Sequence, residues 1–148
     1  MSQETKMLIF TIGDQYYSAD IMEVERILIY EEPTILPDSP NFLRGVINYE
    51  GNILPVISLS DRFNKITNID QDQLKIIVAR ENDKKIGIIV DSVSEVKPIK
   101  EEQIEEAPDI ASEVSKRYIK GLIKENERII VFLTLSNILS EEEKQLVY

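Results

Sequence analysis

Hydrophobic and polar residues alternate along most of this chain, and isoleucine dominates the apolar set. A period of two with many β-branched residues is typical of half-buried β-strands. The pattern predicts strands at residues 7–12, 16–19, 46–49, 52–59, 74–79, 86–90, 118–123 and 128–135. Short turns that contain glycine or polar residues separate several of these strands, which favours pairing into hairpins. The sequence therefore predicts an all-β protein.

Three stretches depart from this alternation. Residues 20–28 fit both a helix and a strand, because their apolar residues recur at both spacings. Residues 97–115 are acidic and contain prolines, which predicts an irregular connection. At the C-terminal end, Ser140 and Glu143 have the spacing of a capping box, in which each side chain bonds the other residue's backbone N–H. A short helix is therefore expected over residues 140–148.

The two halves of the chain resemble each other. Tyr17, Ile21, Val24 and Ile27 match Ile86, Val90, Val93 and Val96 at a constant offset of 69 residues. Further along, the offset is 76 residues, and it relates Gly45, Ile47, Ile53, Val56, Ile57 and Leu59 to Gly121, Ile123, Ile129, Phe132, Leu133 and Leu135. The match indicates two successive antiparallel units of about five strands each, enough for each to curl into a small barrel.

Composition removes most familiar enzyme chemistry. The 148 residues include no cysteine, histidine or tryptophan, so thiol nucleophiles, imidazole bases and Cys or His metal ligands are all absent. The formal net charge is −10, and a chain this acidic is repelled by phosphate backbones and anionic lipids. Neither nucleic-acid binding nor direct membrane binding is expected, and no metal or cofactor site is predicted.

An enzyme built only from carboxylates is an alternative that composition leaves open, since two such groups suffice for glycoside hydrolysis. The acidic residues, however, fall in predicted turns and connections, as solvated surface charge does. The most distinctive stretch is instead residues 45–57, a predicted hairpin that turns at Gly51 and carries Pro55 within a strand. A proline cannot donate to a β-ladder, which predicts an edge or a bulge there and favours a surface that binds another protein.

In this stretch and around it, the sequence resembles the CheW-like family of chemotaxis coupling proteins. The core of the resemblance runs from Gly45 through Asn48 and Gly51 to Pro55. Further matching residues are Phe10, Thr11, Ile12, Gly13, Asp14, Tyr17, Leu36, Pro37, Pro40, Phe42, Gly87, Asp91, Val93, Ile104, Pro108, Tyr118, Gly121 and Leu122. The resemblance covers nearly the whole chain.

The resemblance implies a single CheW-like domain over residues 1–148, with two intertwined five-stranded SH3-like β-barrels and a short C-terminal helix. The first barrel is expected over residues 15–73, and the second over residues 7–14 plus 74–139. The family is non-catalytic and needs no cofactor. It couples the cytoplasmic tips of methyl-accepting chemoreceptors to the regulatory domain of the histidine kinase CheA, which implies a cytoplasmic protein recruited to membrane-associated receptor arrays.

Site residues also follow from the resemblance. Receptor binding in a groove between the barrels is implied for Ile21, Val24, Asn48, Glu50 and Gly51. Kinase binding at the barrel ends is implied for Pro33, Arg44, Gly45, Glu105 and Ile110. Ile21 and Val24 fit a core position equally well.

One residue departs from the pattern of the resemblance. Most members have an arginine where this chain has Glu50, which reverses a charge on the expected receptor surface. A second hypothesis is therefore an adaptor for a divergent receptor or for a signalling array outside chemotaxis.

Overall fold

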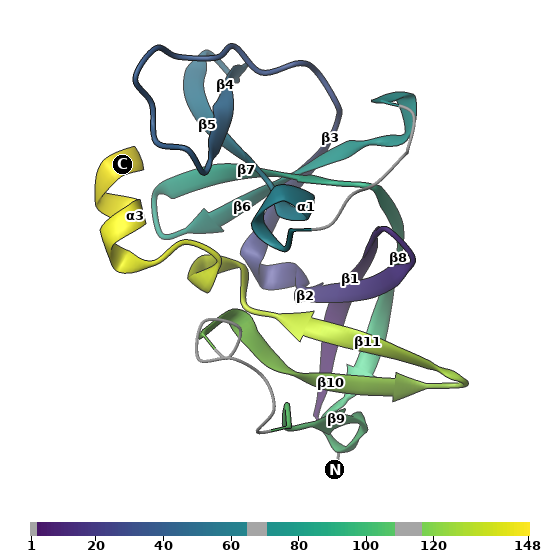
Figure 1. Cartoon of the computed structure of the whole chain (residues 1–148). Coiled ribbons are helices and arrows are strands. Elements are labelled where there is room, and N and C mark those ends of the chain that lie inside the picture. Colours follow the sequence, from purple (N-terminus) through teal and green to yellow (C-terminus); the bar gives the residue numbers. More distant parts are fainter. Residues whose placement is uncertain (1–2, 65–70, 109–116) are drawn as a thin grey trace.

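A computed structural model of the chain describes residues 3–64, 71–108 and 117–148. Strands dominate it and fall into two mixed sheets (Figure 1). The six-stranded sheet contains β1 (Glu4–Ile12), β2 (Gln15–Asp20), β8 (Ser92–Lys100), β9 (Ile104–Glu105), β10 (Ile119–Glu125) and β11 (Arg128–Leu133). The five-stranded sheet contains β3 (Val24–Ile29), β4 (Leu43–Tyr49), β5 (Asn52–Ser58), β6 (Lys75–Glu81) and β7 (Lys84–Val90).

Helices are few and short in the described residues. They are α1 (Leu59–Arg62), α3 (Glu141–Val147) and the 3-10 helices η1 (Ile21–Glu23), η2 (Gln71–Gln73), η3 (Glu101–Gln103) and η4 (Leu135–Asn137). The predicted capping box begins α3, where Ser140 Oγ accepts from the Glu143 backbone N–H and the Glu143 side chain accepts from that of Ser140. The expected all-β fold with a short C-terminal helix is confirmed.

One open alternative is resolved at this level and one expectation needs correction. The ambiguous stretch 20–28 contains both elements, since η1 is followed directly by β3. Residues 97–100 were expected in an irregular connection, but they continue strand β8. Pro98 is tolerated there because β8 is an edge strand, where a missing N–H can be accommodated. Pro55, in contrast, lies in an interior strand, but the pairing of β5 with β7 covers only residues 56–58.

The sheets have matching topologies, in agreement with the sequence repeat. Their strand orders are β8-β1-β2-β11-β10 and β3-β6-β7-β5-β4, with β9 added at the end of the first. In each, the third and fourth strands are parallel, and all other neighbouring pairs are antiparallel. Each sheet combines a hairpin from one half of the chain with three strands from the other half, to which the six-stranded sheet adds the short β9, so the two halves are intertwined.

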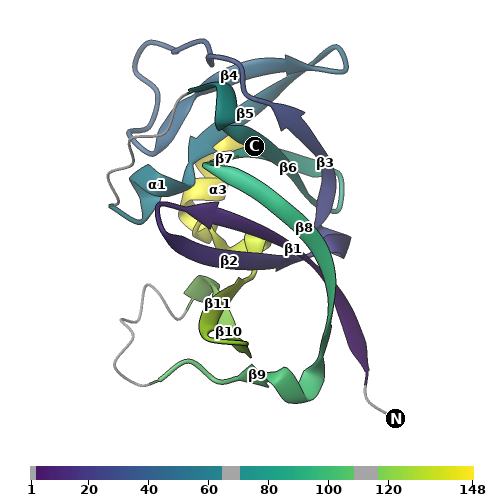
Figure 2. The same ribbon diagram turned by 90° about the vertical axis from the view of Figure 1, so that its right-hand side faces the viewer.

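This exchange corrects the expected barrel boundaries. The division at residues 15–73 and 7–14 plus 74–139 splits the β1–β2 hairpin, but the whole hairpin lies in the six-stranded sheet. The hairpin of β6 and β7 likewise belongs with β3, β4 and β5. Figure 2 shows the consequence: β8 runs as one long curved strand from the region of β7 down to β9.

Three hydrophobic clusters fill this architecture. The largest takes residues from both sheets, including Phe10, Tyr17, Ile57, Ile77 and Ile88, and continues to Leu135, Ile138 and Leu139 near α3. A second cluster, with Val56 and Ile76, lies within the five-stranded sheet. A third, with Ile9 and Ile123, lies within the six-stranded sheet. Because neighbouring strand residues face opposite sides, each sheet packs one face on its own cluster and the other on the shared one.

Two glycines at equivalent positions of the repeat allow another stretch of backbone to pack closely against each sheet. The stretch that contacts Gly45 lies between β3 and β4, and we call it the bridging segment. A Cβ added to Gly45 would be 2.4 Å from the Thr34 carbonyl oxygen, and one added to Gly121 would be 2.8 Å from the Glu105 carbonyl oxygen. Gly51, at the β4–β5 turn, has open space where its Cβ would be. Close packing of the backbone therefore requires glycine at residues 45 and 121.

We expect Gly45→Ala to lower the free energy of unfolding by ~2–4 kcal/mol, because the new methyl group collides with backbone that cannot rotate away. Gly51→Ala should cost only ~1 kcal/mol, the penalty for a left-handed residue without a clash. Urea denaturation of both variants measures the difference. Equal losses would show that the contact of Gly45 with Thr34 does not restrict that position.

Candidate protein-docking surfaces

The turn between β4 and β5 holds three of the expected receptor-binding residues. Glu50 and Gly51 both have positive φ angles, 51° and 83°, which is typical of the two-residue turns that match strand twist. Asn48 Oδ1 accepts from the Gly51 backbone N–H at 3.1 Å. The equivalent of Glu50 in the other half is Asn126, with φ 56°. Asparagine tolerates this conformation better than glutamate does, so the backbone alone does not account for glutamate at position 50.

The same turn lies opposite β3. β3 and β4 are the two edge strands of the five-stranded sheet, and side chains rather than paired backbone join them. We call this side-chain contact between two edge strands a seam. Tyr49 OH donates to Glu25 Oε2 at 2.7 Å, and Arg26 Nη1 lies 3.5 Å from Glu50 Oε1. The Arg26 and Glu50 side chains are 57% and 52% exposed, so this ion pair is weak and open to competition by a partner.

The inner part of the seam is held more firmly. Lys85 Nζ lies 3.1 Å from Glu25 Oε2, and Arg80 Nη1 lies 3.7 Å from Glu25 Oε1. Hydrogen bonds from Tyr49 and Lys85 hold the pKa of Glu25 below its usual value. Burial, together with the bond to Glu25, raises the pKa of Tyr49 well above its ordinary range. Tyr49 therefore stays protonated and donates to a carboxylate that stays ionised.

Exposed apolar side chains accompany this seam. Residues 26–29 of β3, Glu31 and residues 48–50 together line a shallow groove. Within it, Ile29 is 78% exposed and Ile27 is 39% exposed. Exposed isoleucines between charged residues are suited to docking an amphipathic partner.

The other two expected receptor residues lie in different surroundings. Ile21 and Val24 are half-buried and pack against the shared core. Between them, the Glu23 carboxylate accepts from the backbone N–H groups of Leu135 and Ser136, both at 3.0 Å. The structure thus brings Asn48, Glu50 and Gly51 together at one turn and places Ile21 and Val24 at the crossing into β3.

The expected kinase-binding residues fall into two groups. Pro33, Arg44 and Gly45 lie together, since the bridging segment pairs through Thr34 with Val46 and packs Pro33 against Gly45. The Arg44 guanidinium donates to Asp61 Oδ2 at 2.7 Å.

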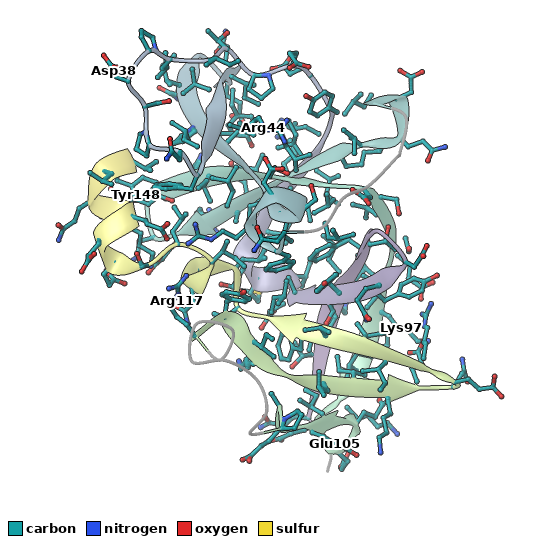
Figure 3. The ribbon with its side chains drawn as sticks, viewed as in Figure 1. Asp38, Arg44, Lys97, Glu105, Arg117 and Tyr148 are labelled. Carbon is teal, nitrogen blue, oxygen red and sulfur yellow. The ribbon has the colours of Figure 1, made fainter. Side chains whose placement is uncertain are left out.

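Glu105 belongs to β9, 3.3 Å from Lys124, and Figure 3 shows it at the opposite end of the molecule from Arg44. Ile110 lies outside the described residues. One flat partner surface therefore cannot cover both groups.

A second seam closes the six-stranded sheet. Lys97 Nζ lies 2.5 Å from Glu125 Oε2, and Arg128 Nη2 donates to Glu125 Oε1 at 2.9 Å. The Arg128 guanidinium also lies 4.2 Å from the centre of the Tyr16 ring. The bond from Lys97 outweighs burial and, with that from Arg128, holds the pKa of Glu125 below its usual value.

A catalytic centre does not emerge from the described residues. Two carboxylates among them are buried, Asp91 and Glu125. Asp91 accepts from the Gly13 backbone N–H at 2.6 Å, whereas Glu125 is neutralised by cations in its own seam. They do not form the clustered carboxylate pair that the enzyme hypothesis requires. In the same residues, no group of three or more acidic side chains is placed to hold a metal ion, and no helix is long and apolar enough to cross a membrane.

Comparisons with known proteins agree with this picture of an adaptor. A family model described as a CheW-like domain matches residues 6–143. The chain belongs to the CheW-like family. Its members are non-catalytic scaffold adaptors of chemotaxis, so the carboxylate-only enzyme is ruled out and the expected family is confirmed.

Similar proteins span nearly the whole chain. The chemotaxis protein CheW of Klebsiella aerogenes is 34% identical over 142 residues, which cover 96% of this chain and 86% of that protein. The chemotaxis protein CheW of Thermotoga maritima is also 34% identical over 142 residues, covering 94% and 90%. The crystal structure of the scaffolding protein TtCheW from Thermoanaerobacter tengcongensis has a TM-score of 0.86 at 29% identity and covers 98% of this chain and 99% of that chain.

Sequence reasoning missed the β3 residues of the seam. Glu25 and Arg26 lie in the stretch that fitted both helix and strand, so their partners across the seam stayed undetermined. A signal existed in the apolar run from Ile27 to Tyr30, which suits a strand, but it was too short to exclude a helix.

Stability should decrease in acid because of these seams. The folded-state pKa of Glu25 and that of Glu125 lie below their ordinary values, so the unfolded chain binds more protons as pH falls. We expect the free energy of unfolding to be level above about pH 6 and to decrease below about pH 5. Glu125→Gln should make that decrease shallower in urea denaturation at a series of pH values. Glu142→Gln, which removes an exposed carboxylate of α3, controls for net charge; an identical slope for the two variants would contradict the prediction.

Proposed function

We propose that this protein couples transmembrane chemoreceptors to the histidine kinase CheA, as a cytoplasmic adaptor recruited to membrane-associated receptor arrays. Membership of a family of chemotaxis scaffolds supports the proposal. So do candidate docking regions that lie apart, at the β4–β5 turn, at the start of β4 and at β9, in a chain without catalytic chemistry. The protein itself binds neither nucleic acid nor lipid in this scheme, in keeping with its net charge of −10.

The receptor surface is the groove between β3 and the β4–β5 turn. The observation that carries this assignment is the turn itself: Glu50 is exposed and held at φ 51°, a conformation that favours asparagine or glycine. Because backbone preference disfavours glutamate at this φ angle, we attribute Glu50 to its role in binding. Asn48 and Gly51 shape the turn, Ile27 and Ile29 offer apolar contact, and Val24 and Ile21 extend the surface toward the other sheet.

Glu50 determines which receptor is accepted. Two unit charges 4 Å apart interact by about 1 kcal/mol in water and ~4 kcal/mol at a partly buried surface. A receptor with an acidic residue at the contact is therefore bound weakly, and one with a basic or neutral residue is preferred. This reading also supports the second hypothesis, an adaptor for a divergent receptor or an array outside chemotaxis.

We expect Glu50→Arg to strengthen binding to a receptor tip with an acidic contact by roughly five-fold to several hundred-fold. Binding to a tip with a basic contact should weaken, and binding to the kinase regulatory domain should not change. Stability should change by less than ~1 kcal/mol, because the ion pair with Arg26 is exposed. Titration calorimetry with two receptor tips from the same genome and with the kinase regulatory domain measures the three affinities, and urea denaturation measures the stability.

Glu50→Asn is the matched control, since it removes the charge and suits the positive φ angle. Its effects should lie between those of wild type and Glu50→Arg. If neither substitution alters the affinity for either receptor tip, Glu50 lies outside the interface and the receptor surface is assigned to the wrong place.

The kinase surface is proposed at the barrel ends, with Pro33, Arg44 and Gly45 on one and Glu105 on the other. Ile110, also expected to bind the kinase, lies outside the described residues. Any side chain at position 45 collides with the bridging segment, so loss of binding by a Gly45 variant reports on folding as well. Arg44 is the better probe, because its side chain is 39% exposed.

We expect Arg44→Ala to weaken binding of the CheA regulatory domain by roughly five-fold to thirty-fold, the range of a moderate interface residue. Arg26→Ala, which removes an exposed cation of β3 on the receptor surface, should bind the kinase domain as wild type does. Calorimetry without any added cofactor measures both. Undiminished binding by folded Arg44→Ala protein would remove this end of the molecule from the kinase surface.

A further inference from the structure

The C-terminal helix is attached to the five-stranded sheet by a two-pronged ion pair. The Arg62 guanidinium, at the end of α1, donates from Nη1 to Glu143 Oε2 at 2.7 Å and from Nη2 to Glu143 Oε1. The two side chains are only 18% and 22% exposed, so water screens this pair less than it screens the pairs Arg26–Glu50 and Arg44–Asp61. A second bond joins Lys144 Nζ to Glu81 Oε2 at 3.0 Å.

The same end of α1 also contacts the start of β4. Asp61 accepts from the Arg44 guanidinium at 2.7 Å, and the Arg62 guanidinium lies 5.8 Å from the centre of the Phe42 ring. The two adjacent residues Asp61 and Arg62 thus connect α3 on one side with Phe42 and Arg44 on the other.

Neither α1 nor the segment before β4 holds its position alone. A helix of four residues is too short to be stable without tertiary contacts. The start of β4 is irregular. Leu43 N–H donates to the Pro40 carbonyl at 3.0 Å, Val46 exchanges two backbone bonds with Thr34, and the pairing of β4 with β5 shifts register between Leu43 and Gly45, at Arg44. Phe42 packs partly on the shared core, and its contact with Arg62 and that of Arg44 with Asp61 complete the placement of these two side chains.

We propose that Glu143 and Arg62 are positioning residues for the kinase surface: α3, acting through α1, holds Phe42 and Arg44 in the geometry that the kinase regulatory domain binds. This proposal rests on the proposed function, because it takes Arg44 as part of the kinase surface. The C-terminal helix influences kinase binding without touching the kinase.

Glu143→Gln tests the coupling with little disturbance of the helix. Glutamine serves in a capping box as glutamate does, so α3 keeps its N-terminal bonds, while the charge opposite Arg62 is lost. Glu142→Gln, the neighbouring exposed residue, makes the same change in net charge and is the matched control. Arg62→Gln and the double variant complete a mutant cycle.

Two measurements are made on each full-length variant. Amide hydrogen exchange of Leu43 and Val46 reports on the start of β4 without any partner, and calorimetry reports on binding of the CheA regulatory domain and of a receptor tip. For Glu143→Gln we expect at least five-fold faster exchange at both amides and at least five-fold weaker kinase binding. Receptor binding should be unchanged, and Glu142→Gln should behave as wild type. The double variant should lose no more than the larger single loss, because both substitutions break one link.

Each other result identifies what is wrong. Unchanged amide exchange in Glu143→Gln overturns the coupling, whatever the kinase does. Equal losses of kinase and receptor binding overturn it too, since they show a general loss of structure. Faster exchange with kinase binding undiminished separates α3 from the kinase surface and overturns the proposal. If wild-type protein does not bind the kinase domain, the proposed function fails, and the exchange data still decide whether α3 positions β4.

Discussion

Two connections that are too short to turn back determine how this chain folds. Three residues, η1, join β2 to β3, and one residue, Asp91, joins β7 to β8. If β3 lay in the sheet of β2, at the place that β8 takes, the two strands would be parallel with β1 between them. The chain would then have to travel back along a strand of about 20 Å, whereas three residues span at most ~11 Å. Each connection must therefore continue into the other sheet, and each sheet receives a hairpin from the opposite half.

The crossings also place a carboxylate where the two sheets meet. Glu23 binds two backbone N–H groups at the start of η4, and Asp91 binds the N–H of Gly13 in the β1–β2 turn. A buried or half-buried carboxylate with such partners is well satisfied, and removing it leaves donors unpaired. Because the shared cluster takes side chains from both sheets, the halves are joined by a common core as well as by the chain. The two barrels are thus expected to unfold together rather than separately.

The exchange leaves each sheet with two edges that side chains must close. In the five-stranded sheet, the inner bridge of Tyr49 and Glu25 is shielded, and the outer bridge of Arg26 and Glu50 is exposed. The same seam therefore supplies both rigidity and an open surface with apolar and charged groups. At the other end of β4, Asp61 and Arg62 relate the bridging segment to α3. A protein without catalytic groups gains its function from such surfaces, because a scaffold needs only stable positions for its partners.

The sequence by itself determined what depends on neighbouring residues. Alternation located most strands, the capping box at Ser140 and Glu143 located α3, and the offsets of 69 and 76 residues indicated the repeat. Composition excluded imidazole and thiol chemistry, and the resemblance around Asn48 and Gly51 identified the family. Only the tertiary structure decided which hairpin joins which sheet, that Glu25 and Arg26 meet Tyr49 and Glu50, and that Arg44 and Glu105 lie at opposite ends. The two hairpins have the same pattern and fit either sheet locally. The choice depends on chain connection and long-range packing, which a period of two does not encode.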